Sequence, residues 1–193
     1  MTTPSPIHKS IARAAAAAFG GGPRVDRYWD DAHEASVDIL TCVDSPWEGV
    51  TSYATIGVSE IPLVKDGKEL AVRTELVGAC GSQFDKFAKY LATAAFCIVK
   101  QRRFVAPDVV IPDVLSMYDP LANARHLLFV PPFLWDGRLV GIDVGTRRVE
   151  WLLAVPISDG ELQMAESKSV AALREIFEER QIDIFDLRRP SVV

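Results

Sequence analysis

Residues 151–155, with the sequence WLLAV, constrain the fold more than any other stretch of this chain. None of the five side chains carries a charge or a hydroxyl, so both faces of an extended strand here would be apolar. Such a strand is typical of the centre of a sheet, where both faces are covered. The sequence therefore predicts a sheet with a buried central strand over about residues 148–157.

Further stretches have the composition of strands. Over residues 69–77 apolar and polar side chains alternate, with Arg73 and Glu75 on the polar side, and this period of two predicts a half-buried strand. Residues 44–49 carry turn-forming side chains at nearly every position and are predicted to join two strands. The other strands are predicted over residues 24–29, 37–43, 50–57, 126–130 and 138–143, with one short strand inside 107–120.

Four stretches are predicted to be helical. The most regular pattern covers residues 83–100, where apolar side chains recur along a single stripe. Ser82, with Asp85 three residues later, predicts an N-cap at the start of this helix. An earlier helix is predicted over residues 6–19, because three glycines and Pro23 follow it. Shorter helices are predicted after Ser158 and over residues 170–180.

The length and charge of the chain limit its class. With 193 residues and no internal repeat, it is predicted to form one α+β domain. An N-terminal helix and Gly-rich turn occupy residues 1–23, and the main domain occupies residues 24–193. The formal charge of −5 argues against a general nucleic-acid-binding protein, which needs a surplus of Lys and Arg. Short basic clusters, such as Arg188 with Arg189, are interpreted as helix ends and solvated faces.

Apolar runs and cysteines indicate the compartment. No apolar run approaches the roughly 18–20 residues that a membrane-spanning helix needs, so no membrane association is predicted. The Ala-rich N-terminus lacks the strongly apolar core of a signal peptide, and a cytoplasmic protein is expected. Cys42, Cys80 and Cys97 form neither a CxxC pair nor an even-numbered set, which is typical of reduced thiols. Cys42 and Cys97 lie in apolar stretches and are predicted to be packing residues.

Residues 141–146, GIDVGT, spell the phosphate-binding hairpin of actin-like and sugar-kinase ATPases. In those proteins a second Asp–Gly loop faces the first across a cleft, and residues 147–193, which follow the motif, offer no such loop in a hairpin setting. Gly145 supplies the positive φ that a tight hairpin turn requires. The motif is therefore predicted to be an ordinary turn between two strands, with no nucleotide cofactor.

No group of residues carries a signature of catalysis or metal binding. Asp30, Asp31, His33 and Glu34 could suggest a metal site, but neighbouring residues of a polar loop seldom converge on one ion. GxSxG and SxxK motifs are absent, and no cysteine has a histidine near it in the sequence. Glutamates at helical spacing, Glu161 among them, are interpreted as a solvated face. The prediction is a protein with no catalytic residue, no metal and no cofactor.

Two tryptophans in loops are the best candidates for binding a partner. Trp47 stands beside Glu48 in one turn, and Trp135 stands beside Asp136 after a double proline. Each pair combines a large amphipathic ring with a carboxylate, which suits an apolar anchor next to an arginine or lysine of a partner. The alternative is that these rings turn inward and cover the core.

Several motifs together point to a family. They are GVTSYATIGVS at 49–59, RTEL at 73–76, LFVPPF at 128–133 and LAVPIS at 153–158, followed by Glu161 and by IDIFDLRRPS at 182–191. In content and in order they resemble the suppressor-of-fused (SUFU) domain family in its bacterial form. The resemblance extends over about residues 25–191.

This resemblance implies an α/β sandwich, a mixed and mostly antiparallel sheet packed with helices, that binds another protein and has no catalytic site. Animal members hold an extended peptide of a transcription factor between two domains, and this chain corresponds to the N-terminal domain alone. Bacterial relatives resemble immunity proteins, which neutralise toxins. No peptide-contact residue is carried over to this chain.

The function expected is that of an immunity protein, or antitoxin, that neutralises a cognate bacterial toxin by direct binding. An acidic protein suits a basic toxin, because opposite fields speed the encounter. Two alternatives stay open: a regulatory scaffold without a toxin partner, and an enzyme whose site the sequence does not reveal. A toxin encoded beside this protein would favour the immunity protein, and a measurable turnover would favour the enzyme.

Overall fold

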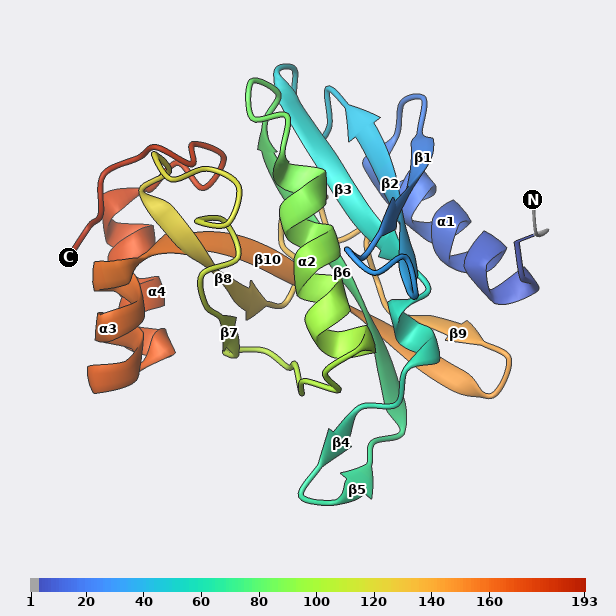
Figure 1. The fold of residues 1–193 in the computed structure, drawn as a ribbon. Helices are drawn as coiled ribbons and strands as arrows, with labels where there is room; N and C mark the ends of the chain where they lie inside the picture. Colours follow the sequence, from blue (N-terminus) through green and yellow to red (C-terminus); the bar gives the residue numbers. More distant parts are fainter. Residues whose placement is uncertain (1–3) are drawn as a thin grey trace.

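An eight-stranded mixed sheet forms the centre of the protein, in a computed structural model that describes residues 4–193 (Figure 1). Its strands follow the order β1-β2-β3-β6-β10-β8-β7. The eighth strand, β9, lies outside this order and pairs with the first residues of β10. β10 runs parallel to β6, and the other neighbouring pairs are antiparallel. The strands are β1 (Arg24–Trp29), β2 (Ser36–Val43), β3 (Val50–Ile56), β6 (Val72–Gly81), β7 (Val110–Ile111), β8 (Ala124–Val130), β9 (Ile142–Val144) and β10 (Arg147–Ser158).

The central position predicted for residues 151–155 is confirmed. β10 lies between β6 and β8, and its side chains alternate between two separate clusters of buried residues. Leu152 and Ala154 belong to the cluster on one face, and Leu153 and Val155 to the cluster on the other. The sheet therefore has a hydrophobic core on each face, as an apolar run without alternation requires.

A single helix, α2 (Phe87–Val99), covers one face, as Figure 1 shows in front of β3 and β6. It begins four residues later than predicted, at Phe87, and Ser82 is not its N-cap. The Ser82 hydroxyl instead bonds with that of Thr51, 2.8 Å away, and the Ser82 amide donates to the Gly49 carbonyl. Residues before Phe87 thus anchor the end of β6 to the turn before β3.

The other face carries α1 (Pro6–Phe19), α3 (Asp159–Ser167) and α4 (Val170–Arg180). α1 packs against β2 and β3, whereas α3 and α4 lie together at the opposite end of the sheet (Figure 1). The predicted bounds of the first and last helices are confirmed. Ser5 and Ser169 accept the amide of the third residue of α1 and α4, respectively, so local capping sets both starts.

β6 is buried along both faces, and the prediction of a half-buried strand is wrong. Glu75 has no exposed surface, and Arg73 is almost fully buried. The Glu75 carboxylate accepts from the hydroxyls of Thr55 and Ser59 and from the amide of Gly57, at the start of a 3-10 turn, η1 (Val58–Glu60). Burial raises the pKa of Glu75, and these hydrogen bonds oppose the rise.

The GIDVGT stretch forms the hairpin between β9 and β10. Val144 pairs with Arg147, so Gly145 and Thr146 make a two-residue turn. Gly145 has φ 63°, the left-handed value that such turns place on glycine. The prediction of strand, turn and strand is confirmed, with a shorter first strand than expected.

The observed fold is the predicted class, an α+β domain in which a mixed, mostly antiparallel sheet packs with helices. A separate small hairpin, β4 (Val64–Lys65) with β5 (Lys68–Glu69), projects from one end of the sheet (Figure 1).

Cys42 and Cys80 are buried and Cys97 is partly buried, and burial raises the pKa of all three thiols. Among the described helices, none combines the length and apolar character needed to cross a membrane.

Candidate functional site

The turn before β3 presents Trp47 and Glu48 to solvent. Asp44 closes this turn by accepting the Gly49 amide at 2.9 Å, and the Val50 amide donates to the Trp47 carbonyl at 3.1 Å. The Trp47 side chain is 55% exposed, and Glu48 is exposed beside it. A ring of this size held on an ordered turn is a suitable anchor for a partner protein.

Trp135, the other predicted anchor, is a core residue with 1% of its surface exposed. Its ring packs against Phe19 of α1, 4.8 Å between centroids, and its Nε1 donates to the Ser52 hydroxyl at 2.9 Å. In the segment after β8, Trp135 packs against α1 in the core of this face, and Phe133 lines a groove together with residues of α4. The prediction that Trp135 contacts a partner is therefore wrong. Its neighbour Asp136 does reach solvent, with 91% of its side chain exposed.

The two predicted loops meet beneath the surface. The Ser52 hydroxyl that accepts from Trp135 also donates to the Ser45 carbonyl, 2.7 Å away, in the turn that carries Trp47. The indole of Trp135 thus supports the turn whose tip exposes Trp47. The sequence could not show this proximity, because it depends on a contact between residues 83 positions apart.

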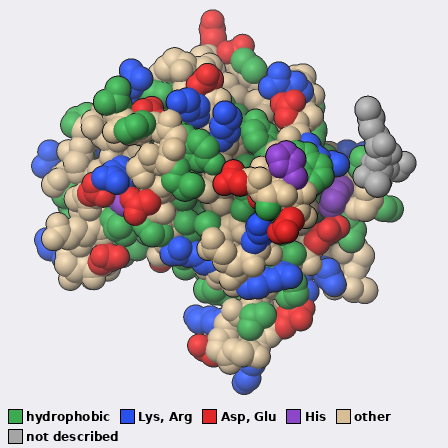
Figure 2. Space-filling view, viewed as in Figure 1, with side chains coloured by type: hydrophobic (Ala, Val, Ile, Leu, Met, Phe, Trp, Pro, Cys, Tyr) green, Lys and Arg blue, Asp and Glu red, His purple; other side chains and the backbone are tan. Residues whose placement is uncertain are grey.

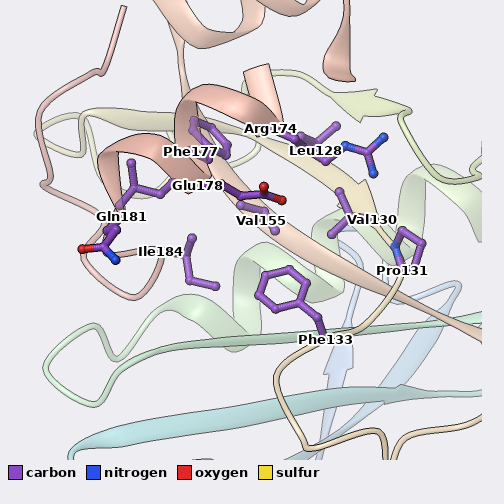
Figure 3. A pocket seen from close by; sticks show the side chains of 11 residues that line it. Leu128, Val130, Pro131, Phe133, Val155, Arg174, Phe177, Glu178, Gln181 and Ile184 are labelled. Carbon is purple, nitrogen blue, oxygen red and sulfur yellow. The ribbon is translucent and has the colours of Figure 1, made fainter. Parts of the chain in front are cut away.

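An apolar groove of about 550 Å³ lies on the face of the sheet that carries α1, α3 and α4 (Figure 3). Leu128, Val130 and Val155 form its floor, and α4 and the segments after β8 and α4 form its walls. Figure 3 shows Phe133 and Ile184 on one side and Phe177 of α4 on the other. Arg174 and Glu178 place one charge of each sign at the rim.

Phe133 is the exposed aromatic residue of the second loop. It is 60% exposed and comes two residues before the buried Trp135. Sequence reasoning selected the larger ring and missed Phe133. The signal available was its position directly after the double proline Pro131–Pro132, which ends β8 and turns the chain away from the strand.

Residues 182–187 connect the groove to the Trp47 turn. Ile184 lines the groove, and the ring of the next residue, Phe185, meets Trp47 edge-on with 5.4 Å between centroids. The Phe185 carbonyl accepts the Gly81 amide at 3.0 Å, which fixes this segment to the end of β6. We call Trp47, Phe133, Phe177, Ile184 and Phe185 the aromatic surface. An apolar surface of this kind on a folded domain is typical of protein recognition.

A buried ion pair holds the chain end that supplies two of these residues. Arg189 donates through both terminal nitrogens to the carboxylate of Glu161, which has no exposed surface, with the second contact at 2.7 Å. Glu161 also accepts the Ser158 amide in the capping box of α3, and Arg189 lies over the Phe177 ring. The interpretation of Glu161 and Arg189 as solvated side chains is wrong.

The acidic loop after β1 has a structural role. The Asp30 carboxylate accepts the amides of Glu34 and Ala35 and pairs with Lys100 at the end of α2. Within residues 4–193, no group of three His, Cys, Asp or Glu side chains is arranged to hold a metal ion.

On the face of the molecule seen in Figure 2, acidic and basic side chains are interspersed and form no broad basic area.

The comparison with protein families matches residues 33–190 to the model for suppressor of fused protein (SUFU). The chain belongs to the SUFU family. It is 44% identical over 186 residues to Immunity protein YqcF of Bacillus subtilis (strain 168), an alignment that covers 96% of this chain and 97% of that protein. The family predicted from the sequence motifs is therefore confirmed.

Solved structures of SUFU proteins share the fold. A putative SUFU homolog from Neisseria gonorrhoeae superposes with a TM-score of 0.75 at 14% identity, covering 97% of each chain. A chain of the Sufu–Fu complex superposes with a TM-score of 0.70 at 15% identity, covering 98% of this chain and 93% of that one. Drosophila Suppressor of Fused gives 0.53 at 15% identity, and only 42% of its chain is covered. The SUFU fold is thus kept where little sequence identity remains.

Proposed function

We propose that this protein is a non-enzymatic, cytoplasmic immunity protein that neutralises a cognate toxin by binding it. The observation that carries the proposal is the 44% identity to Immunity protein YqcF over 96% of the chain. The alignment covers 96% of this chain and 97% of that protein, so it spans the loops as well as the sheet and the helices. The name of that relative therefore supports a similar role here.

The aromatic surface is the part of the molecule proposed to contact the toxin. Trp47 and Phe133 are more than half exposed, and the groove between Phe133 and Phe177 can receive an apolar side chain. Glu48 and Asp136 add exposed carboxylates next to these anchors. A stable complex buries about 1,200–2,000 Å² in total, and a few such anchors supply most of its binding energy.

A growth-rescue experiment tests the proposal. The protein is expressed together with the toxin encoded beside it, as wild type and as Trp47→Ala and Phe133→Ala. We expect the wild type to restore growth and at least one variant to lose rescue, with binding weakened by about 2 kcal/mol or more. Circular dichroism and thermal melting confirm that each variant is folded.

Trp29→Ala is the matched control. Trp29 is 50% exposed, close to the value for Trp47, but it lies at the end of β1 that pairs with Ser36, away from the turn after Val43. Its loss should leave rescue intact. If the wild type does not rescue growth, the immunity function is overturned. If both loop variants rescue growth fully, the interface with the toxin lies outside the aromatic surface.

A further inference from the structure

The two edges of the sheet differ in how well they are protected from pairing with another chain (Figure 1). At one edge, β7 has only two residues, and so short a strand offers little backbone to a partner. At the other edge, β1 extends over the six residues Arg24–Trp29 and pairs with β2 in an unbroken register. β1 contains no proline, lysine or bulge, which are the features that commonly protect an edge strand. Within the described chain, β2 is the only strand that bonds to it.

The backbone groups of Val25, Arg27 and Trp29 face the open side of β1. The Asp30 amide donates to the Ala35 carbonyl at 3.0 Å, in the same register as the β1–β2 pairs. Hydrogen bonds between antiparallel strands come from every second residue, so the even-numbered residues of β1 bond to β2. The odd-numbered residues direct their N–H and C=O groups away from β2. A strand placed along this side would therefore meet unpaired donors and acceptors.

The side chains of the same three residues share one face of the sheet and are exposed. Val25 is 48% exposed and Trp29 is 50% exposed. The Trp29 ring stacks on His33 in the following loop, with 6.0 Å between centroids, and this contact holds the ring in place. Between them, Arg27 donates to both carboxylate oxygens of Asp38 on β2, at 2.7 and 2.9 Å. β1 thus exposes an apolar side chain on either side of a closed ion pair.

We propose that β1 pairs with β1 of a second copy of this chain, antiparallel about a two-fold axis at Arg27. This register uses all the free backbone groups of Val25, Arg27 and Trp29 in both copies, which gives about six hydrogen bonds. It also places Val25 of each copy opposite Trp29 of the other, and such cross-strand apolar pairs stabilise a sheet. The sheet then continues from one copy into the next through an isologous interface.

The charges along β1 favour a second copy over an unrelated strand. Pairing about Arg27 places Arg24 of one copy, whose side chain is 75% exposed, opposite the start of the acidic loop after β1 of the other copy. That loop exposes the carboxylates of Asp31 and Glu34, so unlike charges meet at both ends of the interface. At its centre Arg27 meets its own counterpart, but Asp38 binds each of the two guanidinium groups. The strand is therefore complementary to itself in this register.

Sedimentation and hydrogen exchange test the proposal without any partner. The contact between two short strands is smaller than a standard interface, so we expect a micromolar dimer that populates between about 50 µM and 1 mM. By NMR, the amides of Val25, Arg27 and Trp29 should exchange about threefold more slowly at the higher concentration, because only the dimer supplies their acceptors. The amides of Asp26 and Tyr28 are internal controls, since they already bond to β2.

Two variants test the register. Val25→Pro removes an N–H on the open side of β1, where an edge strand tolerates proline, and should raise the dissociation constant of the dimer about tenfold or more. Trp29→Ala removes the ring opposite Val25 and should raise it about threefold or more. Val140→Ala is the control, because Val140 is 61% exposed in the segment before β9, and it should leave the dimer unchanged. Circular dichroism and thermal melting confirm that each variant is folded.

The proposal is overturned if the protein stays monomeric at about 1 mM. It is also overturned if a dimer forms while the three outward amides exchange equally fast at both concentrations, or if neither β1 variant weakens it. Protection of these amides that appears only when a toxin is added would show that the edge receives a strand of the toxin, not a second copy. Self-association is measured without toxin, so its outcome is independent of the proposed immunity function.

Discussion

Asp30 ties three parts of the chain together at the end of β1. One carboxylate oxygen accepts the amides of Glu34 at 2.8 Å and Ala35 at 3.0 Å, and the other pairs with Lys100. The hydrogen bond from Ala35, followed by that from Lys100, lowers the pKa of Asp30 to about 2. These contacts hold the loop between β1 and β2 against the end of α2.

The lowered pKa of Asp30 predicts a pH-dependent contribution to stability. An aspartate in the unfolded chain has a pKa of about 3.9, so protons bind the unfolded state more readily. The stabilisation is complete above about pH 4 and is lost as the pH falls through about 2. Asp30→Asn should therefore lower the free energy of unfolding at pH 7, and the difference from wild type should shrink between pH 4 and pH 2. Urea unfolding at each pH measures it.

Asp31→Asn serves as the control, because Asp31 is exposed in the same loop. This variant should follow the wild type at every pH. A difference between Asp30→Asn and wild type that stays constant down to pH 2 would show that the ionised carboxylate is not what stabilises the loop.

The two loop tryptophans show what single residues do and do not reveal in a sequence. Both stand in loops and directly before a carboxylate residue, and the sequence alone left open whether either ring turns inward. Trp135 is buried because Ser52, far away in sequence, accepts its indole N–H and Phe19 packs on its ring. Trp47 stays exposed because the turn that carries it closes through its own backbone and Asp44. Tertiary contacts therefore decide whether such a ring points into the core or toward solvent.

At the scale of elements, local signals predicted most of the fold. The bounds of α1 and α4 follow from serine caps that lie next to them in sequence, and the tight β9–β10 turn follows from Gly145. The start of α2 and the burial of β6 could not be predicted in this way. β6 is covered on both faces because β3 and β10 flank it, and its polar residues find buried partners such as Thr55.

The C-terminal segment, residues 181–193, is the element with the least regular structure, and Glu161 and Arg189 hold it in place. Glu161→Gln removes the charge that neutralises Arg189. We expect the free energy of unfolding to fall by about 3–5 kcal/mol, because a buried charge is left without its partner. Hydrogen exchange should also become faster at residues 182–187, which supply Ile184 and Phe185 to the aromatic surface. Chemical denaturation and exchange mass spectrometry measure the two effects.

Glu166→Gln, an exposed glutamate of the same helix, is the control for this change. A double replacement of Glu161 and Arg189 by methionine should cost less than Glu161→Gln, because neither charge then remains buried. Equal effects of Glu161→Gln and the control would mean that the ion pair does not hold the segment.

At the scale of the whole molecule, the two faces of the sheet are covered differently. The α2 face is filled by one helix, whereas the other face leaves a groove between α4 and the segment that carries Trp135. The rim of the proposed interface is acidic at Glu48 and Asp136, and the chain as a whole carries a charge of −5. The acidity follows from the sequence, and of the two candidate rings Trp47 is exposed, but the groove arises only when α4 folds over β8 and β10.

This charge predicts how the protein associates with a basic toxin. Raising the salt concentration from about 0.05 to 0.5 M should slow association markedly, since exposed charges are then screened beyond a few ångströms. Glu48→Gln and Asp136→Asn should each slow association at low salt while leaving dissociation almost unchanged, because rim charges steer the encounter. Trp47→Ala should instead accelerate dissociation, because a packed anchor holds the formed complex. Stopped-flow or surface plasmon resonance separates the two rates.

Asp66→Asn, which removes the same charge on the distant β4–β5 hairpin, is the control for these variants. If it slows association as much as Glu48→Gln does, net charge alone steers the encounter and the interface need not include the Trp47 turn.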